Sequence, residues 1–234
     1  MKKNTKAFTL IELLVVITII GILVTLVVVN MGSAIDKTKI TKVNKSLGSF
    51  WTAYTNNSSS FPQPDDLSDQ SPAGFAAYAW DKWEWEQIEF WYMEDAADVA
   101  DLKDDDADGM PAFLGDGDGD LDTDVTAAQK KAISWEIAIP KQGKTGHLAN
   151  VAKRRKGGRF PVMWTKGLQS DGIWEGDSPW AGSGGHILWS DGKFEFYEDT
   201  SSDDDKGIFR DDSGNRTKDI TQAIPEDWQI LKPE

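Results

Sequence analysis

The chain has 234 residues, no Cys and only two His, and its formal net charge of −14 is unevenly spread. Without Cys it has no disulfide, no thiol chemistry and no Cys-based zinc site. Lys2, Lys3 and Lys6 give residues 1–7 a charge of +3, and four Lys against two acidic residues give residues 8–60 a charge of +2. Residues 61–234 therefore carry −19. Such an acidic segment repels phosphate, so we expect no nucleic acid among its partners.

The first predicted element is an apolar helix that begins at Phe8. The apolar run from Phe8 to Met31 has about 24 residues, more than the ~20 that a helix needs to cross a bilayer. The basic residues before it predict a cytoplasmic N-terminus. A secretory signal would have a shorter apolar region followed by a small-residue cleavage site. Glu12 lies within the run, and because a carboxylate in hydrocarbon is costly unless it is paired, we expect it to be functional.

Residues 7–12, Ala-Phe-Thr-Leu-Ile-Glu, resemble the prepilin processing motif of type IV pilins and type II secretion pseudopilins. The resemblance implies that residues 1–7 are a leader peptide, which a prepilin peptidase removes by cleaving between Ala7 and Phe8. It also implies that the new amino group of Phe8 is methylated. Glu12 would then pair with the N-terminal amine of a neighbouring subunit during assembly. Ala7 stands where the family usually has Gly, and it preserves the small size that cleavage needs.

The same resemblance implies a function, partners and a location. The chain would be a structural subunit of a type IV pilus-like filament or a type II secretion pseudopilus. Its partners would be other copies of itself, minor pilins, the prepilin peptidase and an inner-membrane assembly platform. It would lie in the bacterial inner membrane with its globular part in the periplasm, and then enter a periplasmic or extracellular filament. The alternative is a minor or tip pilin that binds a secreted substrate or a glycan through an aromatic and acidic surface.

The apolar helix is predicted to continue as an amphipathic helix. Apolar residues recur mostly at three- and four-residue spacing from Ile35 to Tyr54, with four Lys between them. The Asn- and Ser-rich stretch 56–60 then ends the helix. We therefore expect an α+β protein in which the helix 8–56, transmembrane over its first part to residue 31, packs on a domain at 61–234. That domain would contain an antiparallel sheet and long acidic loops.

Residues 75–102 are rich in Trp and acidic residues. Within them Trp80, Trp83, Ile88 and Trp91 have the spacing of one face of a helix. An exposed aromatic surface for a secreted partner or a carbohydrate is one interpretation. Because large aromatics bury the most apolar area, we favour a helix that packs them into the core.

The stretch 104–124 contains nine Asp, many of them alternating with other residues. Its first part fits the D-x-D-x-D-G start of an EF-hand-like loop, although Gly115 stands at position twelve, where Glu is expected. A solvated acidic loop is the simpler alternative. Two ladders of alternate carboxylates on Gly-containing turns can converge on a hard cation, so we expect Ca²⁺ as a cofactor. The predicted ligands are Asp104, Asp106, Asp108, Asp116, Asp118, Asp120 and Asp122.

Residues 133–139 and 160–164 are expected to form two half-buried strands. In each, large apolar residues alternate with other residues, the pattern of a strand with one face on the core. In the first strand this pattern places Glu136 on the outer face.

A β-hairpin is predicted over residues 186–197. Its centre is an Asp-Gly pair, which is typical of a two-residue type I′ turn. That turn places Trp189 opposite Phe194. Two residues further along, it places Ile187 opposite Phe196, which makes one face of the hairpin apolar.

A cluster of five basic residues follows the first predicted strand. DNA binding is one interpretation, and pairing with the acidic surface of a neighbouring subunit is the other. We favour the second because the domain is so acidic. The cluster consists of Lys153, Arg154, Arg155, Lys156 and Arg159.

No catalytic set of residues can be argued from spacing. With only two His, the chain offers no recognisable Ser/His/Asp arrangement, and its acidic residues are not ordered as a pair. We expect His186 to be structural, and we expect the protein not to be an enzyme.

Overall fold

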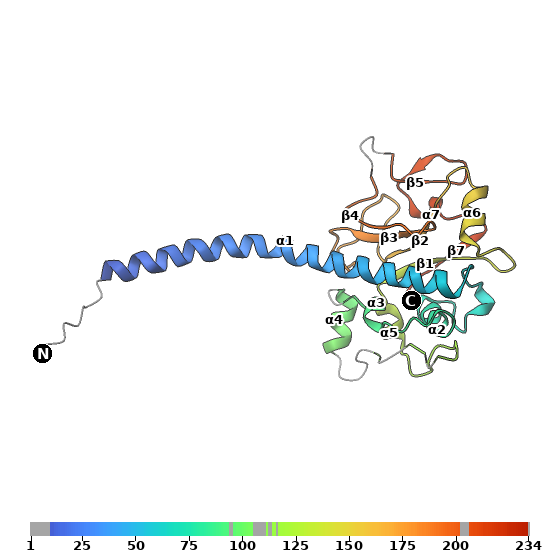
Figure 1. Cartoon of the computed structure of the whole chain (residues 1–234), viewed down its shortest axis with the longest axis horizontal. Coiled ribbons are helices and arrows are strands. Elements are labelled where there is room, and N and C mark those ends of the chain that lie inside the picture. The colour runs from blue at the N-terminus through green and yellow to red at the C-terminus, as the bar shows by residue number, and fades with distance from the viewer. Residues whose placement is uncertain are drawn as a thin grey trace, which may run out of the picture. The chain divides into compact units, whose positions relative to one another are not determined.

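The computed structural model describes residues 10–93, 96–104, 111, 114–115, 117–201 and 206–233, without the side chains of residues 10–12, 20–36, 103 and 104. The chain divides into two compact units, Met1–Val43 and Asn44–Glu234. A single helix, α1 (Leu10–Asn57), belongs to both (Figure 1). It ends at the Asn- and Ser-rich stretch, where the side-chain amide of Asn57 donates hydrogen bonds to the carbonyls of Ala53 and Trp83, both at 3.1 Å.

The second unit contains a five-stranded sheet in the order β4-β3-β2-β1-β7. Every neighbouring pair is antiparallel, so the expected antiparallel sheet and the α+β class are confirmed. The strands are β1 (Trp135–Pro140), β2 (Pro161–Thr165), β3 (Gly185–Trp189), β4 (Phe194–Tyr197) and β7 (Trp228–Leu231).

Short helices and a small ribbon complete the second unit. In Figure 1, α2, α3, α4 and α5 lie together below the last turns of α1, whereas α6, α7 and β5 lie above them. The helices are η1 (Pro64–Asp66), α2 (Pro72–Trp83), α3 (Ile88–Trp91), α4 (Ala97–Asp104), α5 (Ala127–Ala132), α6 (Leu148–Arg154) and α7 (Ile220–Ala223), and the ribbon pairs β5 (Phe209–Arg210) with β6 (Arg216–Thr217).

Aromatic side chains form much of the core of this unit. Phe50, near the end of α1, is fully buried, and its ring centroid lies 5.6 Å from that of Trp83 and 5.4 Å from that of Phe90. The ring of Phe90 in turn stacks on Trp135 of β1 at 4.9 Å. The last turns of α1 are therefore joined to the sheet through α3 by one continuous set of ring contacts.

The single helix expected within 75–102 is wrong. The expected burial is confirmed for Trp83 and Trp91, whereas Trp80 is half-buried. α2 ends at Trp83 because Glu84 adopts a left-handed conformation (φ 56°); the N–H of Glu84 donates to the carbonyl of Trp80, and the N–H of Trp85 donates to that of Ala79. Helix resumes only at α3. The buried rings of Trp83 and Trp91 thus come from different helices, and both contact the ring of Phe50.

The expected half-burial of the first strand is also wrong. All six residues of β1 are buried, including Glu136, which is only 6 % exposed. β1 pairs with β2 on one side and β7 on the other. Phe90 covers one face, and on the other the backbone N–H of Gly167 reaches a carboxylate oxygen of Glu136 at 3.4 Å. The alternation of residue types along β1 therefore distinguishes the two faces of the strand, but it does not mean that one of them is exposed, because both faces are covered.

The hairpin forms where it is expected, but its register is shifted by one residue. Leu188 lies opposite Phe194, and Ile187 lies opposite Glu195. The N–H of Trp189 donates to the carbonyl of Lys193 at 2.8 Å, so three residues rather than two form the loop, and the last of these is a left-handed glycine.

Ser190 explains this register. Its backbone N–H donates to the carbonyl of Phe160 at 2.8 Å, and its hydroxyl accepts from the N–H of Phe160 at 3.1 Å. Ser190 is thereby bound to the start of β2 and takes its place in the loop. Gly192 (φ 83°) then closes the loop without backbone strain.

Candidate functional site

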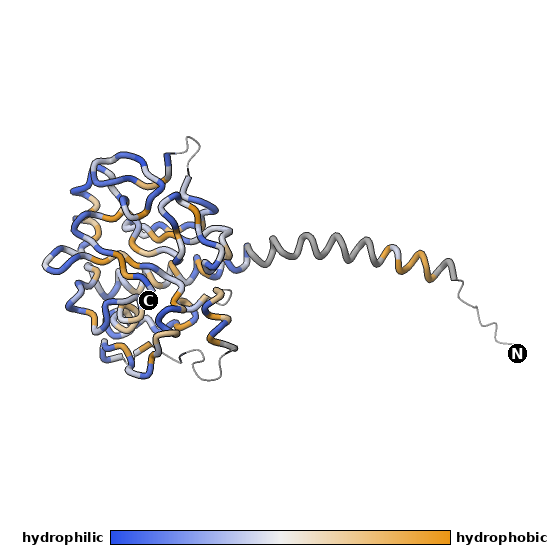
Figure 2. Tube along the Cα trace, turned by 180° about the vertical axis from the view of Figure 1, so that it is seen from behind, coloured by the Kyte–Doolittle hydropathy of each residue, from blue (hydrophilic) through white to orange (hydrophobic). Residues whose placement is uncertain are grey.

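Residues 13–19 of α1, in the first unit, form an exposed and mostly apolar segment. Six large apolar residues between 13 and 19 are about half exposed, from 46 % for Val16 to 58 % for Leu13 and Ile17 (Figure 2). The one polar residue among them, Thr18, donates its hydroxyl to the carbonyls of Leu14 (3.0 Å) and Val15 (2.8 Å). Because this hydroxyl is satisfied inside the helix, the segment can face hydrocarbon or another apolar helix without an unpaired polar group.

The predicted processing residues, Ala7 and Phe8, lie outside the described residues. Glu12 lies in the first turn of α1, and its side chain is also outside the description. Among the described residues, no helix is long and apolar enough to cross a membrane. The roles of Ala7, Phe8 and Glu12, and the membrane span to residue 31, stay predictions.

Residues 2–28 match the family model described as the prokaryotic N-terminal methylation motif. The chain carries the N-terminal methylation motif of type IV pilins and pseudopilins. This motif is characteristic of proteins that are membrane-associated, secreted or assembled into surface filaments. Comparison with curated proteins and with solved structures finds no match. The family evidence thus concerns the N-terminal segment, and the second unit has to be interpreted from its own residues.

The predicted calcium ligands are only partly described. Asp104 ends α4, and Asp106, Asp108 and Asp116 lie outside the description. The remaining three lie in or next to a turn that is closed by an isolated bridge between Gly115 and Leu121.

Two of these carboxylates accept hydrogen bonds from backbone N–H groups close by. Asp118 accepts from the N–H of Asp120 at 2.8 Å, and Asp122 accepts from the N–H of Asp124 at 3.0 Å. Across the described part of the chain, no three acidic or His side chains are gathered as metal ligands would be. The calcium site stays a prediction.

Two arginines of the basic cluster are paired within their own chain. Arg155 is buried and forms an ion pair with Asp212, while its guanidinium also donates to the carbonyls of Ala223 (2.7 Å) and Arg210 (3.0 Å). Arg159 lies 4.3 Å above the ring of Trp189 and 3.6 Å from a carboxylate oxygen of Asp191. The pairing expected with a neighbouring subunit is thus made by these two arginines within their own chain.

The other three basic residues, Lys153, Arg154 and Lys156, are exposed. They remain available to an acidic neighbour.

A charged cleft of about 260 Å³ was not expected from the sequence. Glu136 lies at its wall, 3.7 Å from the ammonium group of Lys232, and burial raises the pKa of its carboxyl against the opposing effect of that lysine. Lys166, also nearly buried, pairs with Asp98 and donates to the carbonyl of Lys131 at 2.9 Å. Glu136 was missed because strand alternation placed it on an outer face, and only tertiary structure shows that this face is covered.

His186 is fully buried, with its ring 5.2 Å from the rings of both Trp180 and Phe196. It therefore lies within an aromatic cluster of the core, as expected for a structural residue.

Proposed function

We propose that the protein is a structural subunit of a type IV pilus-like filament or a type II secretion pseudopilus. Cleavage between Ala7 and Phe8, methylation of Phe8 and assembly through the N-terminal helix are parts of this proposal. The observation that carries it is the methylation motif at residues 2–28. The exposed apolar side chains of residues 13–19 support it, because a folded chain in water does not gain from exposing such a segment unless another surface covers it.

In this proposal the apolar segment has two successive partners. Before assembly it is covered by lipid of the inner membrane, and after assembly by the helices of other copies. Glu12 supplies the polar contact: once the leader is removed, the free amine of a neighbouring Phe8 pairs with its carboxylate. A paired carboxylate is tolerated in an apolar surrounding, and an unpaired one is costly. The prepilin peptidase, minor pilins and an assembly platform are the corresponding protein partners.

Mass spectrometry of the native N-terminus and filament yield together test the proposal. The mature chain is expected to begin with methylated Phe8, and Glu12→Gln is expected to be folded and membrane-inserted but to form few filaments. Thr9→Val, in the same stretch, provides a matched control that should assemble normally. An unprocessed Met1 in assembled material, or a normal filament yield from Glu12→Gln, would contradict the proposal.

A minor or tip pilin that binds a secreted substrate or a glycan is the second candidate. The aromatic surface that would support it is largely internal, since Trp83, Trp85 and Trp91 are buried and Trp80 is half-buried. The ratio of this chain to other pilins in purified filaments separates the two candidates, because a major subunit greatly outnumbers the others.

A further inference from the structure

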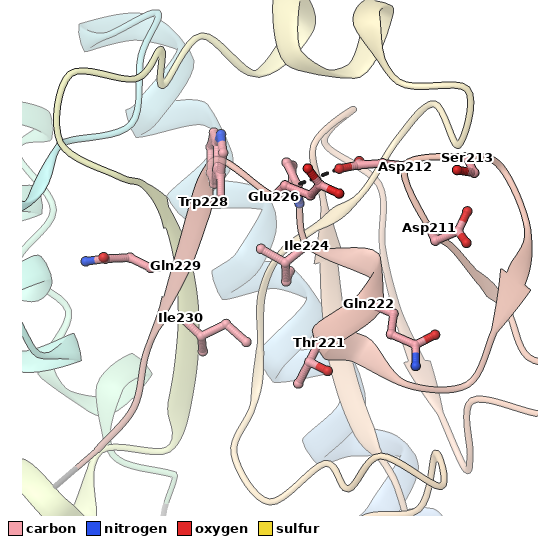
Figure 3. Close-up of a pocket in the computed structure, with 11 residues that line it drawn as sticks. Asp211, Asp212, Ser213, Thr221, Gln222, Ile224, Glu226, Trp228, Gln229 and Ile230 are labelled. Atoms are coloured by element: carbon pink, nitrogen blue, oxygen red, sulfur yellow. Dashed lines mark hydrogen bonds between the residues drawn. The ribbon is translucent and has the colours of Figure 1, made fainter.

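The strand β7 is an edge of the sheet and contributes side chains to the wall of a cavity. Among the described strands, β7 pairs only with β1 and is the last in the sheet order. A cavity of about 520 Å³ lies beside it. Its walls include Ile230 of β7 and the loop residues Asp211, Asp212, Ile224 and Glu226 (Figure 3).

The hydrogen-bond pattern shows which backbone groups of β7 face outward. The N–H of Lys141 donates to the carbonyl of Asp227 at 2.9 Å. In an antiparallel pair, residues alternate between those bonded to the partner strand and those pointing away from it. Counting from Asp227, Gln229 is bonded to β1, whereas Trp228 and Ile230 direct their backbone groups away from it.

Ile230 offers an N–H and a carbonyl that an incoming strand could pair with. Trp228 uses its outward N–H internally, donating to the carbonyl of Pro225 at 2.8 Å. Apart from the ladder between β1 and β7, the described residues form no backbone hydrogen bond with Ile230. Unpaired edge groups of this kind are the usual template for strand addition by an extended peptide.

The side-chain chemistry beside this edge is acidic. In Figure 3, Ile230 points toward Ile224 and Gln229 points to the opposite side of β7. At the upper end of the cavity lie the carboxylates of Asp211, Asp212 and Glu226.

These carboxylates are held in place by local bonds. Asp212 accepts from the backbone N–H of Glu226 at 3.1 Å and is ion-paired with Arg155. Asp211 accepts from the backbone and the side chain of Asn215 at 2.8 and 2.9 Å. The side-chain carboxylate of Glu226 forms no ion pair within the described residues. Asp211 and Glu226 therefore leave the upper end of the cavity negative.

We propose that this edge is a docking site for an extended segment of a partner protein that carries Lys or Arg at alternate positions. Its backbone would add to β7 through Ile230. Every second side chain of the added segment would enter the cavity on the side of Ile230, where Asp211 and Glu226 attract a cation. Ile224 and Ile230 would contact the aliphatic stem of such a side chain, because Lys and Arg bury their methylene groups and keep the charge at the rim.

The proposal is tested with a labelled peptide, Ac-Lys-Val-Lys-Val-Lys-Val-NH₂, added to the full chain in detergent micelles. Fluorescence anisotropy is expected to show saturable binding that weakens with salt. Hydrogen exchange followed by mass spectrometry is expected to show protection in residues 226–232. A peptide with Glu in place of Lys, and one N-methylated at alternate amides, are expected to bind at least tenfold more weakly. Equal binding of the N-methylated peptide, or protection elsewhere in the chain only, would overturn the proposal.

Variants of the chain provide an independent test. Ile230→Pro removes the outward N–H without removing a bond to β1 and is expected to weaken binding about tenfold, whereas Ile230→Val keeps the N–H and should bind normally. Asp211→Asn with Glu226→Gln is expected to weaken binding and to reduce its salt dependence. Unchanged affinity in both the Pro variant and the neutral variant would overturn the proposal. Because the N-methylated peptide leaves the protein unaltered, the result does not depend on whether Ile230→Pro folds.

Discussion

The two units of this chain use the same apolar side chains in opposite ways. Ile17, on α1 in the first unit, is 58 % exposed, whereas Ile137, on β1 in the second, is 0 % exposed. Ile137 is covered by groups of its own chain, and β1 is paired on both sides. The difference teaches that apolar composition alone does not say which groups cover an apolar side chain. In the second unit the covering groups belong to the same chain, and for residues 13–19 we propose that they belong to lipid or to other subunits.

The largest expected effect comes from removing the central ring of the second unit. Phe50→Ala should lower the free energy of unfolding by about 3–5 kcal/mol, because it leaves a cavity among fully buried rings. Ile17→Ala is the matched control and should change it by less than about 0.5 kcal/mol, because that side chain is mostly exposed. Thermal unfolding followed by tryptophan fluorescence measures both. If both variants lost a similar amount of unfolding free energy, the proposed difference between the two units would be wrong.

The basic cluster offers the next largest contrast. Arg155→Ala should destabilise the second unit by about 2–3 kcal/mol, since it leaves Asp212 and two carbonyls without their donor. Arg154→Ala, one residue earlier and exposed, should change the free energy of unfolding by less than about 0.5 kcal/mol. Urea unfolding of the two variants is the measurement. A small effect of Arg155→Ala would show that its pairing does not matter for stability.

Two glycines allow the cost of backbone strain to be separated from the cost of a steric clash. Gly192 and Gly143 both have positive φ, but a Cβ at Gly192 would lie 2.5 Å from the Trp51 ring, whereas one at Gly143 would meet nothing within 4 Å. Gly143→Ala should cost about 1 kcal/mol from strain alone, and Gly192→Ala about 2–3 kcal/mol. Equal melting temperatures for the two variants would show that Trp51 moves aside without cost.

The charged cleft predicts a pH dependence. Burial raises the pKa of Glu136 above its ordinary value of 4.5, so the folded state binds this proton more tightly than the unfolded state. The stability that follows from this is fully present below pH 4.5 and is lost as the pH rises through the raised pKa. Glu136→Gln should therefore be more stable than the wild type at pH 7, and the difference should shrink toward pH 4. A difference that grows on acidification would have the wrong sign.

The smallest expected effect concerns the acidic loop. If it binds calcium as the sequence predicts, a Ca²⁺ concentration of a few times Kd should stabilise the full chain by about 1 kcal/mol. Calorimetry in the presence of Ca²⁺, with Mg²⁺ for comparison, measures this. Asp118→Asn combined with Asp122→Asn should reduce the shift, whereas Asp65→Asn, an acid outside the loop, should not. No heat of binding and no shift in melting would identify a solvated acidic loop.

Features that depend on neighbouring residues could be predicted from the sequence. α1 ends at the Asn- and Ser-rich stretch because those side chains compete for backbone hydrogen bonds. The methylation motif is itself a short linear pattern. Alternating apolar residues correctly placed β1 and β2, because the period of two follows from strand geometry.

Features that depend on residues far apart were decided by the tertiary structure alone. Ser190 takes its place in the hairpin loop because Phe160, thirty residues earlier, binds both its backbone and its hydroxyl. Arg155 became a core residue because Asp212, fifty-seven positions later, lies beside it. No local pattern distinguishes these residues from their neighbours, since the free energy that selects their positions comes from contacts that exist only once the chain has folded.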